Sequence, residues 1–324
     1  MKQPLCPLGE DGKAPPDDYD NHLTRTMRQL TKPHRRRRSP EQRRDFLRSV
    51  CFLSPSVIGV GVFFVLPFGV VVYYSLTAQD GRFVLLENFK NLLDNSVFRL
   101  AARNTLRFSA VAVPLAVVLA IVLALLLEAR IPMKSYFRTF FLSPMMVPVA
   151  SVVLIWQVLF SYNGTLNVLL AHWGVEKIDW LQSEYAPIVV VLLFLWKNLG
   201  YNMILFMAGI ANIPKELLEV ADVEGAGEAY KFFHIKLRYL SPTVLFVTIL
   251  SLINSFKVFR EVYLLTGSYP YTSLYTLQHF MNNMFASMDY RKLSAAAVLM
   301  AIAMVILIAL LFAVEDWFGK DVEG

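Results

Sequence analysis

Residues 108–127 read FSAVAVPLAVVLAIVLALLL and contain no charged side chain. About 20 apolar residues in an α-helix span the roughly 30 Å hydrocarbon layer of a bilayer. This stretch has that length, and its single proline is tolerated in a membrane helix because neighbouring groups satisfy the freed backbone. It therefore predicts a membrane-spanning helix, and the rest of the chain is interpreted around it.

The composition extends this interpretation to the whole protein. Of the 324 residues, 56% are hydrophobic and 17% are charged, and the mean hydropathy is +0.48. A soluble domain cannot bury so much apolar surface in one core. Six stretches have membrane-spanning length: 51–77, 104–128, 137–160, 186–210, 242–265 and 293–315. The predicted fold class is all-α, a polytopic membrane protein with six transmembrane helices.

The charge distribution predicts the topology. If the N-terminus is cytoplasmic, the segments on that side carry 18 lysines and arginines and the opposite segments carry 6. Cytoplasmic loops are enriched in these residues. We therefore expect both termini in the cytoplasm of a bacterium, around a multi-pass protein of the plasma (inner) membrane. The Arg-rich run at 35–48 could also bind nucleic acid or anionic lipid, but the topology rule already explains it, and no nucleic-acid partner is predicted.

Three regions follow from these patterns. Residues 1–48, rich in proline and charge, are expected to form a disordered basic tail. Residues 49–318 form the six-helix transmembrane domain with a cytoplasmic loop at 212–241, and residues 319–324 form a second cytoplasmic tail. Residues 81–103 are expected to form a short amphipathic helix along the outer surface. Bends are predicted in the first span, which contains Pro55 and Pro67, and in the third span, which contains Pro144 and Pro148.

The loop between the fourth and fifth spans contains a helix–turn–helix pattern. Residues 213–226 read IPKELLEVADVEGA. Pro214 suits a helix start, and Glu216 favours the positive end of the helix dipole. Gly225 permits a tight reversal, and a second helix is expected from about 227 to 240. A short helix with small residues at its turn and acids on its exposed side is suited to dock into a partner.

These residues resemble the EAA loop of binding-protein-dependent ABC importer permeases. The resemblance is carried by Glu219-Val220-Ala221, Glu224-Gly225-Ala226 and Ile235-Lys236-Leu237, and it covers about 50–318. Flanking motifs such as Ile178-Asp179-Trp180-Leu181 are similar to the carbohydrate and glycerol-phosphate branch, in particular to the first of its two permease subunits. Two positions depart from the pattern: Val220 replaces an alanine, and Arg238 stands where a proline is common.

The resemblance implies a coupling role for the loop. Glu219 would contact a cytoplasmic ATPase, Ala221 would pack closely, and Gly225 and Ala226 would make the turn. The implied partners are a second permease subunit in a heterodimer, two cytoplasmic ATPase subunits, an extracytoplasmic solute-binding protein and membrane lipid. The chain contains no G-x-x-x-x-G-K-[ST] phosphate loop. ATP and magnesium are therefore expected on the ATPase, with no cofactor on this chain.

Polar residues within the fourth and fifth spans predict a solute path, because such residues are costly in a membrane unless they serve a function. The candidates are Asn198, Tyr201, Asn202, Asn254, Ser255, Phe256 and Lys257. Amides, hydroxyls and aromatic faces suit a sugar. Hydrogen bonding between helices of adjoining subunits is an equal alternative. Lys257, Arg260 and Glu261 are alternatively expected to pair with one another near the outer interface.

The predicted function is a permease subunit that forms half of a translocation path for a sugar or related polar solute. No catalytic or metal-ligating pattern is present, since the five histidines are scattered and H-E-x-x-H and G-x-S-x-G are both absent. The alternative is a secondary transporter or channel that needs no ATPase. Such a carrier would be expected to show broken-helix repeats and a buried acid for ion coupling.

Overall fold

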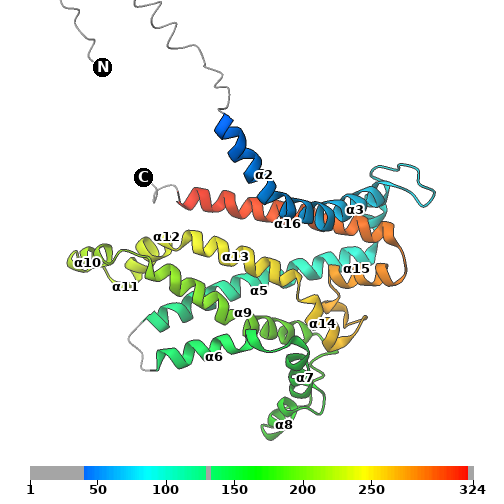
Figure 1. Ribbon diagram of the computed structural model, residues 1–324. Coiled ribbons are helices and arrows are strands. Elements are labelled where there is room, and N and C mark those ends of the chain that lie inside the picture. Colours follow the sequence, from blue (N-terminus) through cyan, green and yellow to red (C-terminus); the bar gives the residue numbers. More distant parts are fainter. Residues whose placement is uncertain (1–39, 129–132, 320–324) are drawn as a thin grey trace, which may run out of the picture. The chain divides into compact units, whose positions relative to one another are not determined.

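The computed structural model describes residues 40–128 and 133–319, and these are mainly helical (Figure 1). Within them the only β pairing is a bridge between Thr77 and Phe83. The helices in chain order are α2 (Pro40–Val60), α3 (Leu66–Leu76), α4 (Glu87–Asp94), α5 (Ser96–Glu128), α6 (Lys134–Met146), α7 (Val149–Phe160), α8 (Thr165–His172), α9 (Ala186–Ala211), α10 (Lys215–Val223), α11 (Glu228–Tyr230), α12 (Leu237–Tyr239), α13 (Ser241–Phe256), α14 (Phe259–Thr266), α15 (Leu277–Ala286) and α16 (Tyr290–Gly319). Shorter π and 3-10 segments are η1 (Gly61–Val65), η2 (Lys231–Lys236) and η3 (Thr272–Leu274). The all-α prediction is confirmed.

Six helices in the described part of the chain are long and apolar enough to cross a membrane. They are Arg48–Leu76, Ser96–Glu128, Val149–His172, Ala186–Ala211, Ser241–Thr266 and Tyr290–Asp316. Their number agrees with the prediction. The second and third differ in their bounds for reasons that lie in the local sequence.

The second span begins earlier than expected, because α5 starts at Ser96 rather than at 104. The side-chain oxygen of Asn95 accepts hydrogen bonds from the backbone N–H groups of Val97 (2.9 Å) and Phe98 (3.1 Å). This contact is an N-cap, which satisfies donors that have no partner inside the helix. The expected surface helix at 81–103 is therefore corrected to the shorter α4, and the remainder belongs to α5.

The predicted third span, 137–160, is divided at Val147 and Pro148, between α6 and α7. α6 continues through Pro144 to Met146, so the interruption lies after this proline. Val147 is extended (φ −82°, ψ 132°), and α7 begins at Val149. A residue before proline avoids the α region because the ring crowds its backbone, which explains why the helix ends at this position.

The chain divides into two compact units, Met1–Leu66 and Pro67–Gly324. In the first unit, α2 begins at Pro40 and continues through Pro55, so residues 40–48 of the expected tail are helical. The rest of that tail and residues 320–324 lie outside the described residues. The π-helical segment η1 follows α2 and precedes Pro67. Pro67 has no N–H and its ring crowds the carbonyl group of Phe63, which disturbs a regular α-helical turn there.

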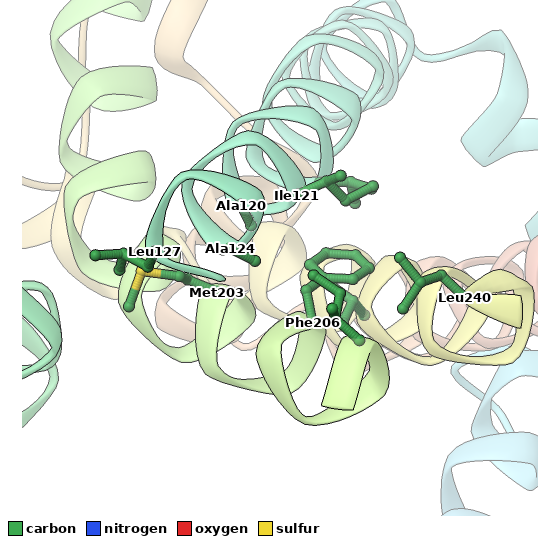
Figure 2. Close-up of a cluster of buried hydrophobic side chains, with 10 residues drawn as sticks. Ala120, Ile121, Ala124, Leu127, Met203, Phe206 and Leu240 are labelled. Atoms are coloured by element: carbon green, nitrogen blue, oxygen red, sulfur yellow. The ribbon is translucent and has the colours of Figure 1, made fainter. Parts of the chain in front are cut away.

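In the second unit the core is centred on the contact between α5 and α9. Every fourth residue of one α5 face is an alanine without solvent exposure, and these are Ala112, Ala116, Ala120 and Ala124. Small side chains let two membrane helices approach closely. Figure 2 shows Ala120 and Ala124 beside Met203 and Phe206 of α9, with Leu240 completing the cluster.

A second close approach joins α9 to α6. A Cβ atom added at Gly200 would lie 1.9 Å from the carbonyl oxygen of Phe141. No side chain fits there, so Gly200 sets the distance between the two helices. The same stretch of α9 carries the polar residues predicted for the solute path.

Candidate functional site

The predicted cytoplasmic loop forms the helix α10 and its turn. Pro214 precedes the helix at the N-cap position, and Glu216 lies in the first turn. Ala221 is the buried residue of α10, whereas Glu219 is exposed. The predicted short helix is therefore present, with one small residue packed inward and an acid on the open side.

The end of α10 has the geometry of a Schellman motif. Gly225 is left-handed (φ +77°). Its N–H donates to the carbonyl oxygen of Asp222 at 3.1 Å, and the N–H of Ala226 donates to that of Ala221 at 2.9 Å. These two bonds satisfy carbonyl groups that the helix leaves free. Gly225 occupies the left-handed position because it has no Cβ to clash with the backbone.

Lys231 ties the two arms of the loop together, a contact that sequence reasoning missed. Its buried ammonium group lies 2.5 Å from the carboxylate of Asp222 on α10 and 2.5 Å from that of Glu228 on α11. Hydrogen bonding to Asp222, and then to Glu228, raises the pKa of Lys231 above its usual value. Asp222 and Lys231 are nine residues apart and lie on different helices, which the turn at Gly225 brings together. Their spacing therefore matches no helical repeat that sequence analysis could detect.

The second arm of the loop is helical from Glu228 to Tyr239, close to the expected range of 227–240. Its middle, η2, is wound as a π-helix, and such segments often mark functional positions. The helical run is interrupted at Leu240, where ψ is −7°, and Pro242 lies in the first turn of α13. Thus a helix boundary is present at Leu240 although Arg238 replaces the proline common in the resembling family.

The loop leaves apolar surface uncovered on this chain. Val223 is 89% exposed and Val220 is 57% exposed. Leu217, Val220 and Ala226 also line a groove of about 940 Å³, whose other wall includes Val244 of α13 and Leu311 of α16. Exposed apolar side chains on a short polar helix are typical of a surface that another protein covers.

The polar residues predicted for the solute path form a seam between α9 and α13. Asn254 donates a hydrogen bond to Asn198 (3.0 Å), and Asn202 donates to Ser251 (2.9 Å). Ser255 extends the seam to α5, because its hydroxyl lies 2.8 Å from that of Ser109. α9 and α13 run antiparallel. The four residues forward from Asn198 to Asn202 on α9 therefore correspond to the three residues back from Asn254 to Ser251 on α13. These hydrogen bonds join helices of one chain, whereas the alternative stated above placed them between adjoining subunits.

The other three predicted path residues lie beside the seam without joining it. Tyr201 and Phe256 are half-buried, and Lys257 is exposed. α13 ends at Phe256 with Lys257 at its C-cap position, and α14 begins at Phe259. The fifth span is therefore interrupted between these two helices. Irregular backbone at membrane depth is tolerated where it is buried in protein or lines a water-filled cavity.

One expectation about the charged residues is corrected. Glu261 of α14 pairs with Lys197 of α9 as well as with its neighbour Arg260, and no ion pair joins it to Lys257 among the described residues. The guanidinium group of Arg260 is farther away, at 3.8 Å. The sequence signal for this pair was Lys197, a lone lysine inside an apolar span, because a buried charge in a membrane requires a partner.

Within the described residues, no group of three or more His, Cys, Asp or Glu side chains is placed to hold a metal ion.

Comparison with solved structures supports the same architecture. The crystal structure of a bacterial alginate ABC transporter, in complex with an alginate pentasaccharide-bound periplasmic protein, contains a chain of similar fold. Its TM-score is 0.76 at 20% sequence identity, over 86% of this chain and 97% of that chain. At this identity the likeness establishes the fold.

Two curated relatives align over most of the chain. The sulfoquinovosyl glycerol transport system permease protein SmoG of Agrobacterium fabrum is 31% identical, over 79% of this chain and 86% of the relative. The sn-glycerol-3-phosphate transport system permease protein UgpA of the same organism is 28% identical, over 80% and 92%. The family described as "binding-protein-dependent transport system inner membrane component" matches residues 112–324, which include α10, its turn and the polar seam. This chain therefore belongs to the family of inner-membrane components of binding-protein-dependent transport systems.

Proposed function

We propose that this chain is one of two permease subunits of an ABC importer and forms half of the path for a sugar or related polar solute. The relatives carry the names of sugar and glycerol-phosphate transport systems, which favours this class of solute. The partners in this proposal are a second permease, two cytoplasmic ATPase subunits and an extracytoplasmic solute-binding protein. Both termini and α10 face the cytoplasm in this arrangement.

The observation that carries the proposal is the construction of α10. Both ends of the helix are fixed, since Pro214 precedes it and the turn at Gly225 ends it. The ammonium group of Lys231 also pairs with Asp222 on the helix. A partner that acts by rigid-body motion requires a stiff lever. Glu219 and Val223 stand on the open side, where they are available to the ATPase.

The proposed path lies along the seam and the interruption at Lys257. The side chain of Asn198 also donates to the carbonyl oxygen of Phe194 (2.8 Å), so its orientation is set before a solute arrives. The hydroxyl of Tyr201 has no hydrogen-bond partner among the described residues and remains available to a solute. Pre-oriented amides beside an aromatic ring are suited to sugar hydroxyl groups.

The decisive experiment removes the contact with the ATPase. Glu219→Lys reverses the charge on the open face of α10 without touching the seam, so co-purification of the ATPase and ATP-driven solute uptake should both fall at least tenfold. Glu176→Lys is the matched control, because Glu176 is exposed in the loop between the third and fourth spans. Retention of both activities by Glu219→Lys would contradict the coupling role. Solute uptake by vesicles that hold this chain without an ATPase would favour a secondary transporter.

The proposed orientation is tested by labelling with an impermeant maleimide. Glu228→Cys, in a chain whose native Cys6 and Cys51 are replaced by serine, should react in inside-out vesicles and remain unlabelled in intact cells. Glu176→Cys should show the opposite pattern. Labelling of Glu228→Cys in intact cells would reverse the proposed topology.

A further inference from the structure

The fourth and fifth spans contain more positive than negative charge. The charged residues of Ala186–Ala211 and Ser241–Thr266 are Lys197, Lys257, Arg260 and Glu261. One carboxylate therefore stands against three cations. Uncompensated charge inside a membrane is costly and marks a functional position.

The carboxylate is already engaged. One oxygen of Glu261 pairs with Lys197, whose side chain is 25% exposed, and the Glu261 side chain is only 7% exposed. Arg260 reaches the same oxygen at 3.8 Å, so it shares this one carboxylate with Lys197, and its side chain is 66% exposed. Lys257 has no carboxylate partner among the described residues. The surplus positive charge is thus on Lys257 and Arg260.

Both cations lie inside the fifth candidate span, Ser241–Thr266, rather than at its ends. A helix rises about 1.5 Å per residue, which places Lys257 about 14 Å and Arg260 about 9 Å from the end of the span at Thr266. The hydrocarbon layer is roughly 30 Å thick, and both cations lie within the length of this 26-residue span. Ionised side chains at this depth face a bundle interior or a water-filled cavity rather than lipid.

The interruption of the fifth span supplies such a position. Lys257 occupies the break itself, and Arg260 lies three residues later in the first turn of α14. The seam amide of Asn254 lies one turn before Lys257. Two exposed cations and an oriented amide therefore lie close together in the sequence, around the interruption of the span.

We infer that the transported solute carries a negative charge, and that Lys257 and Arg260 bind its carboxylate, phosphate or sulfonate group during passage. This inference rests on the proposed importer function and narrows the class of its solute. A neutral sugar would leave the three cations of these spans with a single carboxylate as counter-charge. An anionic sugar supplies a further negative charge, and the half-buried amides of Asn198 and Asn254 hold its hydroxyl groups.

The test compares charged and neutral members of matched sugar pairs. The complete importer, with its second permease, ATPase subunits and binding protein, is reconstituted in liposomes. The pairs are digalacturonate with galactobiose, glucose 6-phosphate with glucose, and 6-sulfo-6-deoxyglucose with glucose. We expect ATP hydrolysis and uptake to respond to the anionic member of at least one pair and at least tenfold less to its neutral counterpart.

Variants then connect this selectivity to the two cations. Lys257→Gln and Arg260→Gln should each raise the KM for the anionic sugar about tenfold, and Lys257→Arg should retain most of the affinity. Lys90→Gln is the control, because Lys90 is an exposed lysine on α4. A response to neutral sugars equal to that for anionic ones, or a KM within twofold of the parent in both glutamine variants, overturns the inference and leaves the importer function standing. If no sugar of either charge stimulates ATP hydrolysis, the proposed function itself fails and the inference fails with it.

Discussion

The backbone N–H of Ala226 donates a 2.9 Å hydrogen bond to the carbonyl oxygen of Ala221, spanning the left-handed Gly225. Ala221 is buried while its neighbours Val220 and Asp222 are exposed. This one bond therefore sets both where α10 ends and which of its faces remains open. The proposed coupling depends on that geometry, because a lever with a frayed end transmits motion poorly.

Gly225→Val should weaken coupling without unfolding the protein. No atom lies within 4 Å of a Cβ built at Gly225, so the cost comes from the left-handed backbone alone, about 1–3 kcal/mol for a β-branched residue. ATPase co-purification and uptake should fall, while the amount of membrane-inserted protein stays near the parental level.

Two variants control this prediction. Gly227 has an extended backbone (φ −69°, ψ 159°) and equally open surroundings, so Gly227→Val should behave like the parent. Gly225→Asn should retain most activity, because asparagine tolerates the left-handed region. Equal loss in both valine variants would show that bulk, rather than backbone conformation, is responsible.

Lys197→Met should destabilise the protein strongly, because Glu261 would remain buried with its main partner removed. Breaking one side of a buried ion pair costs about 3–5 kcal/mol. The double variant Lys197→Met with Glu261→Gln should recover much of that loss. The measurement is the midpoint of thermal aggregation of purified protein in detergent, and a double variant less stable than either single one would argue against a direct pair.

Gly200→Ala should destabilise the contact between α9 and α6. The added methyl group would meet the Phe141 backbone at 1.9 Å, and such overpacking costs about 1–3 kcal/mol. Gly69→Ala in α3 is the control, since nothing lies within 4 Å of its Cβ position. A thermal midpoint unchanged by Gly200→Ala would mean that the two helices can separate freely.

Acidification should destabilise the protein through His279. This histidine is buried in α15, where its Nδ1 accepts from the backbone N–H of Thr276 in a capping box, and burial lowers its pKa from 6.5 to about 4. The unfolded chain therefore gains a proton below pH 6.5, and the folded protein does so only below about pH 4. Stability is complete above pH 6.5 and falls progressively toward pH 4, by about 3 kcal/mol at about 1.4 kcal/mol per pKa unit.

His279→Gln isolates this effect, because glutamine can also complete a capping box and does not titrate. Thermal midpoints measured between pH 7.5 and pH 4.5 should fall less steeply in this variant than in the parent. His172→Gln, at an exposed histidine of α8, should keep the parental slope. Identical slopes in all three proteins would assign the acid sensitivity to other groups.

The sequence by itself determined the features that depend on local composition. Six apolar stretches predict six membrane helices, because the cost of exposing polar backbone to lipid allows no other common solution. Pro214, Glu216 and Gly225 predict α10 and its turn, because helix ends are controlled by residues within a few positions. The placement of the seam on the fourth and fifth spans also followed from sequence, since polar residues stand out against apolar neighbours.

Only the tertiary structure decided which of these residues meet. The pairing of Lys197 with Glu261 depends on the rotation and register of two helices that are far apart in the chain, and hydropathy contains neither quantity. The bond between Asn198 and Asn254, the close approach of Gly200 to Phe141 and the reach of Lys231 to Asp222 depend on them as well. Local sequence chooses helices and turns through short-range hydrogen bonding, whereas the contacts of their side chains are chosen by packing over the whole bundle.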